Sequence, residues 1–220
     1  MRQWLATLIL LQTLTGGPSM AQDTPLHAAA IAGDTATIQR LLAAGTPVDT
    51  RDPAGRTPLL EAVEHNQTAA GLALLAAGAS PNAQASNADT PWLLAGASGR
   101  TALLAAMIPH GPDFSLRNRY GGNALIPACE RGHVETVELL LTTPIDVNHI
   151  NRLDWTCLLE IILLGDGGPR HQAITRRILA AGANPNLADG QGITPLAHAR
   201  ARGQHEIAAL IEAAGGRMTR

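Results

Sequence analysis

The fold is first indicated by the stretch Thr24-Pro25-Leu26-His27-Ala28-Ala29-Ala30. Its pattern returns as Thr57-Pro58-Leu59-Leu60-Glu61-Ala62-Val63, as Thr90-Pro91-Trp92-Leu93-Leu94-Ala95-Gly96 and, more loosely, as Asn123-Ala124-Leu125-Ile126-Pro127-Ala128-Cys129. Two further copies begin at Thr156 and Thr194. The first five copies begin 33 residues apart, and the last step is 38 residues. A period held this well indicates a stack of repeated structural units.

Each unit carries residues that begin and end two short helices. Its first residue is Thr in all copies but one and suits a helix N-cap, and a Pro in the next position suits the first helical residue. Leu and Ala at helical spacing form an apolar stripe that faces the next unit. A glycine then ends the first helix in four units, at Gly33, Gly99, Gly132 and Gly203. The second helix ends in stretches such as Leu41-Leu42-Ala43-Ala44-Gly45.

In combination these motifs resemble the ankyrin repeat, over residues 23–215. Further matches are Gly132-His133-Val134-Glu135 and the turn Ala79-Ser80-Pro81-Asn82. The resemblance implies an all-α ankyrin-repeat solenoid of about six helix–turn–helix units with short β-hairpin connections. It also implies that His27 is structural and bonds to neighbouring backbone. Since no unit buries its apolar face alone, all units share one elongated core.

The N-terminus is typical of a secretory signal peptide. Arg2 supplies a positive charge, residues 4–14 (WLATLILLQTL) are apolar, and Ser19-Met20-Ala21 offers the small residues that a signal peptidase reads. We predict cleavage after Ala21 and a periplasmic or secreted protein with no membrane insertion after cleavage. The alternative is an uncleaved anchor, although the apolar segment is short for a membrane span.

The predicted domain plan has three parts. Residues 1–21 are the signal peptide, residues 22–216 are the repeat array, and residues 217–220 are a frayed tail. Within the array the repeats, numbered one to six below, begin near 24, 57, 90, 123, 156 and 194. Positions within a repeat are counted from that first residue, and the loop that leads into it is assigned to the same repeat.

Three repeats depart from the pattern. Repeat four begins with Asn123 and carries Pro127 inside its expected first helix, where the ring would strain the helix. In repeat three, Pro109 predicts an early end to the second helix. Repeat five holds five extra residues around 165–172, which predict an enlarged Gly-rich loop between its helices. Such a loop is either a tolerated insertion or a contact surface for a partner.

The two cysteines are Cys129 and Cys157. Cys129 holds position seven of repeat four and Cys157 holds position two of repeat five. Along parallel neighbouring helices these positions are offset by about 7 Å, which strains the limits of disulfide geometry. An oxidising compartment would allow the cysteines to pair, but we predict no disulfide.

A candidate binding surface lies on repeats four and five. Known ankyrin proteins bind with their hairpin tips and with the concave face of their first helices, and here that surface carries aromatic residues beside arginines. Trp, Tyr and Arg are the residues enriched in binding hot spots. The alternative for the tryptophan is that it folds back over the first helix of repeat five. The predicted partner-binding residues are Arg117, Arg119, Tyr120, Glu130, Arg131, Arg152, Leu153 and Trp155.

The sequence lacks the motifs that would indicate an enzyme. It contains no GxSxG, no HExxH, no glycine-rich phosphate loop and no CxxC. His198 and His205 lie near each other in the sequence, but a metal site normally needs three or four ligands. We therefore predict no catalysis, no cofactor and no metal.

The predicted function is protein binding. All sixteen basic residues are arginines and none forms a run, so nucleic acid is a poor match as a partner. We expect a monomeric module that holds, shields or inhibits a protein in the periplasm or outside the cell. The alternative is a secreted effector or a toxin-immunity protein that acts by steric blocking. A metal-dependent hydrolase is a more remote alternative.

Overall fold

The computed structural model describes residues 24–218, so the predicted signal peptide and the last two residues lie outside it. Each repeat contributes a first and a second helix. Repeats one to three contain α1 Pro25–Ala32, α2 Thr35–Ala43, α3 Pro58–Glu64, α4 Thr68–Ala76, α5 Pro91–Ala97, α6 Thr101–Met107 and a short 3-10 helix, η1, Ile108–His110. Repeats four to six contain α7 Leu125–Glu130, α8 Val134–Leu140, α9 Cys157–Leu163, α10 Pro169–Ala180, α11 Pro195–Ala201 and α12 His205–Ala213.

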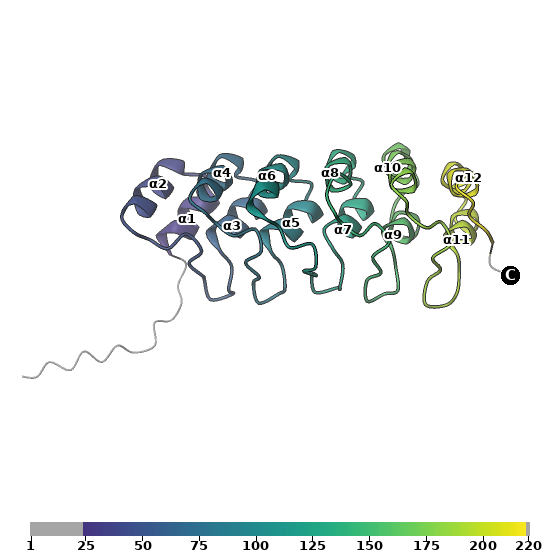
Figure 1. Cartoon of the computed structure of the whole chain (residues 1–220), viewed down its shortest axis with the longest axis horizontal. Coiled ribbons are helices and arrows are strands. Elements are labelled where there is room, and N and C mark those ends of the chain that lie inside the picture. The colour runs from purple at the N-terminus through teal and green to yellow at the C-terminus, as the bar shows by residue number, and fades with distance from the viewer. Residues whose placement is uncertain (1–23, 219–220) are drawn as a thin grey trace, which may run out of the picture.

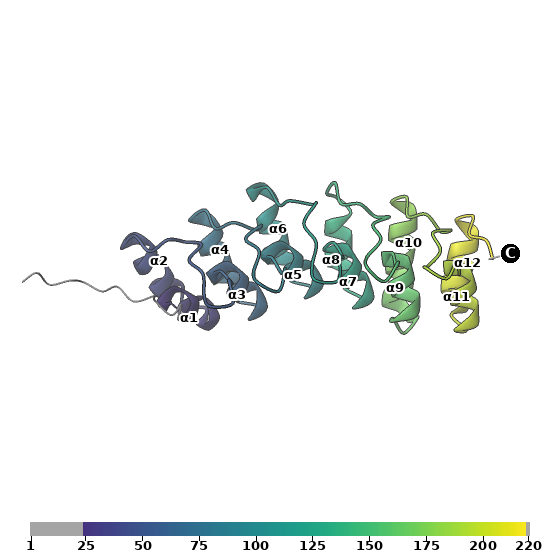
Figure 2. The ribbon, with the colours of Figure 1, turned by 90° about the horizontal axis from the view of Figure 1, so that it is seen from below.

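The helices stand in two parallel rows along one long axis. The first helices, α1 to α11 in odd numbers, form the row next to the loops, and the second helices form the other row (Figure 1). All the loops that join one repeat to the next project on the same side. Turned by 90°, the array is elongated, with α1 and α12 at opposite ends (Figure 2). The predicted all-α solenoid is confirmed.

The predicted β-hairpins are loops, because residues 24–218 contain no strand. Two backbone hydrogen bonds close each of the loops at Asn118 and Asn151: Asn118 N donates to Gly122 O and Gly121 N to Asn118 O, and Asn151 N donates to Trp155 O and Asp154 N to Asn151 O. These bonds form a turn and do not continue into a β-ladder. Neighbouring loops also contact each other, since Arg152 N donates to Tyr120 O.

Position three of every repeat lies in the core. These side chains are at most 3% exposed and follow one another along the first helices. Trp92 fills the place that leucine holds in the other repeats, and Phe114 packs edge-on against its ring at 5.6 Å. The recurring Thr-Pro-Leu motif thus places one large apolar side chain per repeat in a continuous core. The column comprises Leu26, Leu59, Trp92, Leu125, Leu158 and Leu196.

Side chains before or at the start of the second helices bind each repeat to the one before it. Gln67 Nε2 donates to Ile31 O at 3.0 Å, and Gln204 Nε2 donates to Ile162 O at 3.1 Å. His171 Nε2 makes the equivalent bond to Glu130 O at 2.9 Å. His27 links repeats one and two through Arg56 O, as the resemblance implied. The bonds to Ile31, Ile162 and Glu130 satisfy carbonyl groups near the ends of the first helices, whereas Arg56 O lies in the loop before α3.

The proline departures are absorbed at helix ends. In repeat four the helix begins at Leu125, so Pro127 lies in the first turn, where its missing N–H would have had no helical partner. Asn123 Oδ1 accepts hydrogen bonds from Leu125 N and Ile126 N and caps this turn. In repeat three the α-helix ends early, as predicted, and Pro109 lies in η1.

The extra residues of repeat five are divided between a loop and a helix. The loop between α9 and α10 spans residues 164–168, and α10 has 12 residues where α2 and α4 have 9. The expected enlarged loop is therefore only part of the insertion. Asp166 Oδ1 accepts hydrogen bonds from Gly168 N and His171 Nδ1, which hold the loop against the start of α10.

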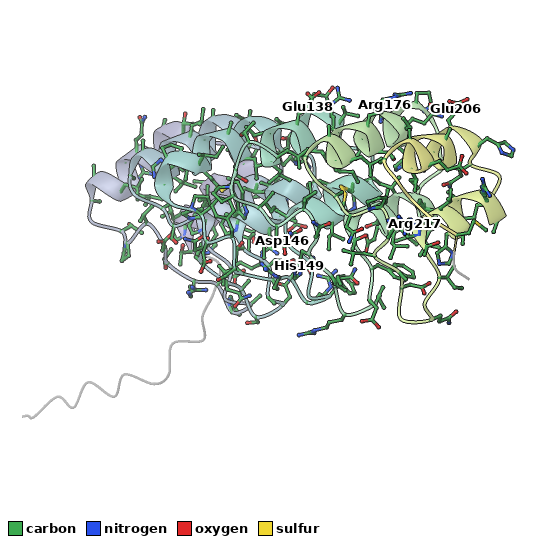
Figure 3. The ribbon with its side chains drawn as sticks, turned by 45° about the vertical axis from the view of Figure 1, so that its right-hand side comes forward. Glu138, Asp146, His149, Arg176, Glu206 and Arg217 are labelled. Atoms are coloured by element: carbon green, nitrogen blue, oxygen red, sulfur yellow. A yellow bond between two sulfur atoms is a disulfide. The ribbon has the colours of Figure 1, made fainter. Side chains whose placement is uncertain are left out.

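The prediction of no disulfide is wrong. Cys129 and Cys157 are bonded, with their Cα atoms 5.7 Å apart (Figure 3). The expected offset assumed that neighbouring first helices are in register, but they are staggered, so that position seven of one repeat meets position two of the next. The same approach recurs between repeats three and four, where a Cβ on Gly96 would lie 2.8 Å from the Cβ of Ala124.

Within residues 24–218, no helix has the length and apolar character that a membrane span requires. The charges of the second-helix row are scattered, as Glu138, Arg176 and Glu206 illustrate (Figure 3). Asp146 and His149 lie on the loop side in the same view. His149 Nε2 lies 2.6 Å from Gly121 O and joins two neighbouring loops.

Candidate functional site

A pocket of about 260 Å³ lies between the loops and the first helices of repeats four and five. Its walls come from the loop before α7, from α7, from the loop before α9 and from α9. Five of the eight predicted binding residues line it: Arg119, Tyr120, Glu130, Arg131 and Leu153. The remaining lining residues are Asn118, Gly122, Ile126, Pro127, Asn151, Glu160 and Leu164.

The other three predicted residues lie outside this pocket. Arg117 Nη1 donates to Phe114 O and Leu116 O, so its guanidinium is held against its own loop. The guanidinium of Arg152 donates to Arg119 O and joins two loops behind the pocket wall. Trp155 is half-buried and lines a second, more open pocket of about 470 Å³ together with Leu153 and His198. The second pocket continues the first along the same side of the array.

Two asparagines give the loops of the site their shape. Asn118 Oδ1 accepts hydrogen bonds from Tyr120 N and Gly122 N, both at 2.9 Å. Asn151 Oδ1 accepts from Leu153 N at 2.9 Å and from Trp155 N at 3.1 Å. Because each amide oxygen is occupied by backbone N–H groups, the orientation of the side chain is fixed. Asn151 therefore directs its Nδ2 group toward the first helix of repeat five.

The acceptor for that group is Glu160, whose carboxylate lies among the lining residues of the pocket. Glu160 is 6% exposed, and its Oε1 accepts from Asn151 Nδ2 at 2.7 Å. Burial, and to a lesser degree the negative charge of Glu130, raise the pKa of Glu160 to about 7, against smaller opposing effects of the Asn151 hydrogen bond and of Arg131. Burial disfavours the ionised form, and a neutral amide supplies no opposite charge.

The two arginines of the pocket are held on the side of repeat three. Arg119 Nη1 lies 3.6 Å from Asp89 Oδ2, and its guanidinium lies 4.8 Å from the centre of the Tyr120 ring. Arg131 Nη1 donates to Ala97 O at 2.7 Å. The positive charges are thus engaged on the N-terminal side of the pocket, while Glu130 and Glu160 line it from α7 and α9.

The rim of the pocket is apolar and accessible. Tyr120, Leu153 and Leu164 are 56%, 53% and 51% exposed. Only six large hydrophobic side chains are exposed among residues 24–218, and these three surround one pocket. An accessible apolar cluster beside charged groups is typical of a protein-binding surface.

One ionisable pair on this side of the array lies beside the second pocket. His198 Nε2 lies 2.7 Å from Asp189 Oδ2, which joins α11 to the loop before it. Among residues 24–218, no group of three or more His, Cys, Asp or Glu side chains could hold a metal ion. The geometry of the site suits binding: an apolar rim, fixed amides and carboxylates at one end.

Sequence reasoning missed Glu160. Its position in the repeat indicated only a residue of the first helix, with no sign that the side chain would be buried beneath the loop. A usable signal was present, however. Glu61 holds the same position in repeat two and follows Arg56 by five residues, whereas the residue five before Glu160 is Trp155. The loss of the arginine marks this acidic residue as different.

Comparison with protein families gives one matching model, described as ankyrin repeats in three copies. It matches residues 6–85 and 72–151. The E. coli K12 ankyrin repeat protein YahD is 51% identical over 114 residues, which are 51% of this chain and 57% of that protein. The aligned part is thus little more than half of that relative's length.

Solved structures extend the likeness to most of the chain. An ankyrin repeat domain from Acinetobacter baumannii AYE is 49% identical, with a TM-score of 0.85, and the alignment covers 88% of this chain and 98% of that one. The ankyrin repeat domain of Bcl-3, a member of the IkappaB family, is 26% identical with a TM-score of 0.78, over 89% of this chain and 87% of that one.

Proposed function

Because the chain belongs to the ankyrin repeat family, whose repeats are protein-binding modules, we propose that it is an exported module that docks one protein against the loops and first helices of repeats three to five. By covering part of that partner, the module shields or regulates a protein of the cell envelope. The module acts sterically and electrostatically, as one protein surface on another, and needs no cofactor.

The observation that carries the docking surface is the clustering of exposed apolar side chains. Tyr120, Leu153 and Leu164 surround the pocket between repeats four and five, and fixed loops hold two of them in place. A smaller pocket of about 110 Å³ adjoins it toward repeat three, lined in part by Asp89 and Leu94. The second pocket, lined by Trp155, continues it toward repeat six. A partner chain lying across these pockets would bury all three apolar residues.

Support for export comes from the N-terminal sequence and from the disulfide. Residues 1–21 have the charge, apolar segment and small residues of a signal peptide. A buried bond joins Cys129 and Cys157, and structural disulfides persist in oxidising compartments. The bond also cross-links repeats four and five, two of the three repeats that form the docking surface, which keeps that part of the surface rigid.

The docking surface is tested by affinity capture from an envelope extract of the producing cells, with the protein as bait. Tyr120→Ala combined with Leu153→Ala should lower recovery of the partner at least tenfold, because both changes remove exposed apolar contacts and neither disturbs the core. The matched control is Leu72→Ala, since Leu72 is 45% exposed on α4 in the second-helix row. Equal recovery by the double variant and the control would contradict this surface.

Export is tested separately, by the N-terminus of the protein recovered from its cells. We expect the mature chain to begin at Gln22 and to be found outside the cytoplasm. A Leu8→Arg change, which places a charge in the apolar segment, should leave the full-length chain in the cytoplasm. A chain that keeps Met1 in the unmodified protein, or an unmodified chain that stays in the cytoplasm, would refute export.

A further inference from the structure

Position five of the repeat faces the loop that precedes its helix, and three of the six repeats carry an ionisable side chain there. Glu61 is paired with Arg56, whose Nη2 also lies 2.6 Å from Glu64 Oε2. His198 Nε2 lies 2.7 Å from Asp189 Oδ2. The third ionisable side chain at this position is Glu160. Across the six repeats the residues at position five are Ala28, Glu61, Leu94, Pro127, Glu160 and His198.

Repeat five lacks both of the residues that pair with position five in repeats two and six. The place of Arg56 is taken by Trp155, and the place of Asp189 is taken by Asn151. Asn151 donates one hydrogen bond to Glu160 Oε1 but brings no charge. Within residues 24–218, Glu160 and Glu130 form no ion pair. A largely buried carboxylate in a pocket therefore has no cation within ion-pair distance, and Arg131, which lowers its pKa only slightly, is bonded to Ala97 O.

We infer that the pocket is a subsite for one lysine or arginine side chain of the bound partner, whose charged end meets the carboxylates of Glu160 and Glu130. The inference rests on the proposed function, because it assumes that a protein segment lies across these loops. The inference requires that this segment contain a lysine or arginine. A basic side chain supplies from the partner the positive charge that Arg56 supplies within repeat two.

The size and rim of the pocket fit such a side chain. Its volume of about 260 Å³ is below the range of roughly 300–1,000 Å³ usual for pockets that enclose a small-molecule ligand. Lysine and arginine carry apolar stems that pack on apolar surfaces while their charged ends reach polar groups. Tyr120, Leu153 and Leu164 offer that apolar surface at the rim, and the carboxylates lie within.

Competing arginines of the chain are engaged elsewhere. Arg119 is held by Asp89, and Arg131 by Ala97 O, both on the side of repeat three. The helices that pack against α9 bring few other titratable groups. From α7 and the residue after it come Glu130 and Arg131, from α10 comes His171 with Asp166, and from α11 comes His198 with Asp189.

The test uses a random library of displayed nine-residue peptides, selected on the immobilised full chain. We expect the selected peptides to share a lysine or arginine between apolar residues. The strongest binder is then synthesised, together with a copy in which norleucine replaces lysine or citrulline replaces arginine. On the wild-type chain the neutral copy should bind at least tenfold more weakly, and on Glu160→Gln the two copies should differ less than threefold.

Proton linkage gives a second readout that a merely structural role of Glu160 would not produce. Binding of a cation favours the ionised carboxylate, so affinity for the basic peptide should rise about tenfold between pH 6 and pH 8. The rise should disappear in Glu160→Gln and persist in Glu206→Gln, a control for an exposed glutamate on the second-helix side (Figure 3). If the rise persists in Glu160→Gln, another group causes it, and the inference is contradicted.

The failures of the two proposals are distinguishable. Peptides that need Tyr120 and Leu153 but show no preference for a basic residue would overturn the subsite and leave the docking surface standing. Peptides that bind without regard to Tyr120 and Leu153 would overturn both. If light scattering shows a dimer of the full chain that Glu160→Gln dissociates, the occupant is a second copy of this chain, which overturns the inference of a separate partner.

Discussion

Repeats two and five carry the same acidic residue at position five and stabilise their surroundings in different ways. In repeat two, Glu61 lies beside Arg56 and the carboxylate is neutralised within the repeat. In repeat five, Glu160 has only the amide of Asn151, and the covalent bond between Cys129 and Cys157 joins the helix to its neighbour instead. In repeat two the carboxylate is therefore paired with a cation of the same repeat. In repeat five the carboxylate is unpaired, and a disulfide joins the repeat to repeat four.

The contrast between Glu61 and Glu160 shows that the position of a residue in the repeat does not determine its role. The backbone presents the same site to both glutamates, but the side chain five residues earlier decides whether the carboxylate has an opposite charge. Where the arginine is absent, a buried carboxylate persists at a cost in stability. Such local costs concentrate at functional sites more than in the structural framework. Four variants test whether the two repeats differ in this way.

The largest effect should come from the disulfide that fastens repeat five. The bond closes a separation of 28 residues, which constrains the unfolded chain and contributes about 3.5 kcal/mol of stability by the loop-entropy model. Replacing both cysteines, Cys129→Ser with Cys157→Ser, should lower the free energy of unfolding in urea by that amount. Reductant should destabilise the wild type and leave the double variant unchanged; equal effects on both would refute the assignment.

Removing the cation of repeat two should give the next largest effect. Arg56→Gln leaves Glu61, whose side chain is 8% exposed, as a buried charge without its partner, which costs about 3 kcal/mol. The loss is measured as the free energy of unfolding in urea, and Arg56→Lys, which keeps a positive charge, should lose less. Equal losses in the two variants would show that the arginine acts by packing and hydrogen bonding rather than by its charge.

The third experiment removes the unpaired carboxylate of repeat five. The pKa of Glu160 is raised to about 7 from its ordinary 4.5, so the folded chain retains this proton at pH values where the unfolded chain has lost it. Its contribution to stability is therefore greatest below about pH 4.5 and falls as the pH rises to about 7. Glu160→Gln should be close to wild type at pH 5 and more stable by about 2 kcal/mol at pH 8, since the open pocket admits water and weakens the effect.

The smallest effect is expected when the arginine of repeat two is copied into repeat five. Trp155→Arg places a guanidinium five residues before Glu160, as Arg56 stands before Glu61. Loss of stability between pH 5 and pH 8 should shrink by about 1 kcal/mol relative to the wild type. The matched control is Trp155→Gln, which removes the same ring without adding a charge. If both variants keep the wild-type pH dependence, the two repeats are not interchangeable at this position.

Much of the candidate site could be predicted from the sequence. The 33-residue period and the resemblance located the loops and first helices of repeats four and five, and five of the predicted residues line one pocket. Arg117 and Arg152 are predicted to bind the partner because of their residue type, but their guanidinium groups donate to carbonyl oxygens of the loops. Hydrogen-bonding of that kind depends on loop geometry, which composition and spacing do not reveal.

The repeat, the all-helical solenoid and the Thr or Asn that precedes each first helix could be predicted from the sequence, because these follow from local propensity and a fixed period. Which residues of neighbouring repeats contact each other depends on the tertiary structure. The stagger of neighbouring first helices brought Cys129 to Cys157, and the loop above α9 buried Glu160 beneath Asn151. Both depend on how one repeat sits on the next, since a shift of a few ångströms along a helix axis changes which side chains touch.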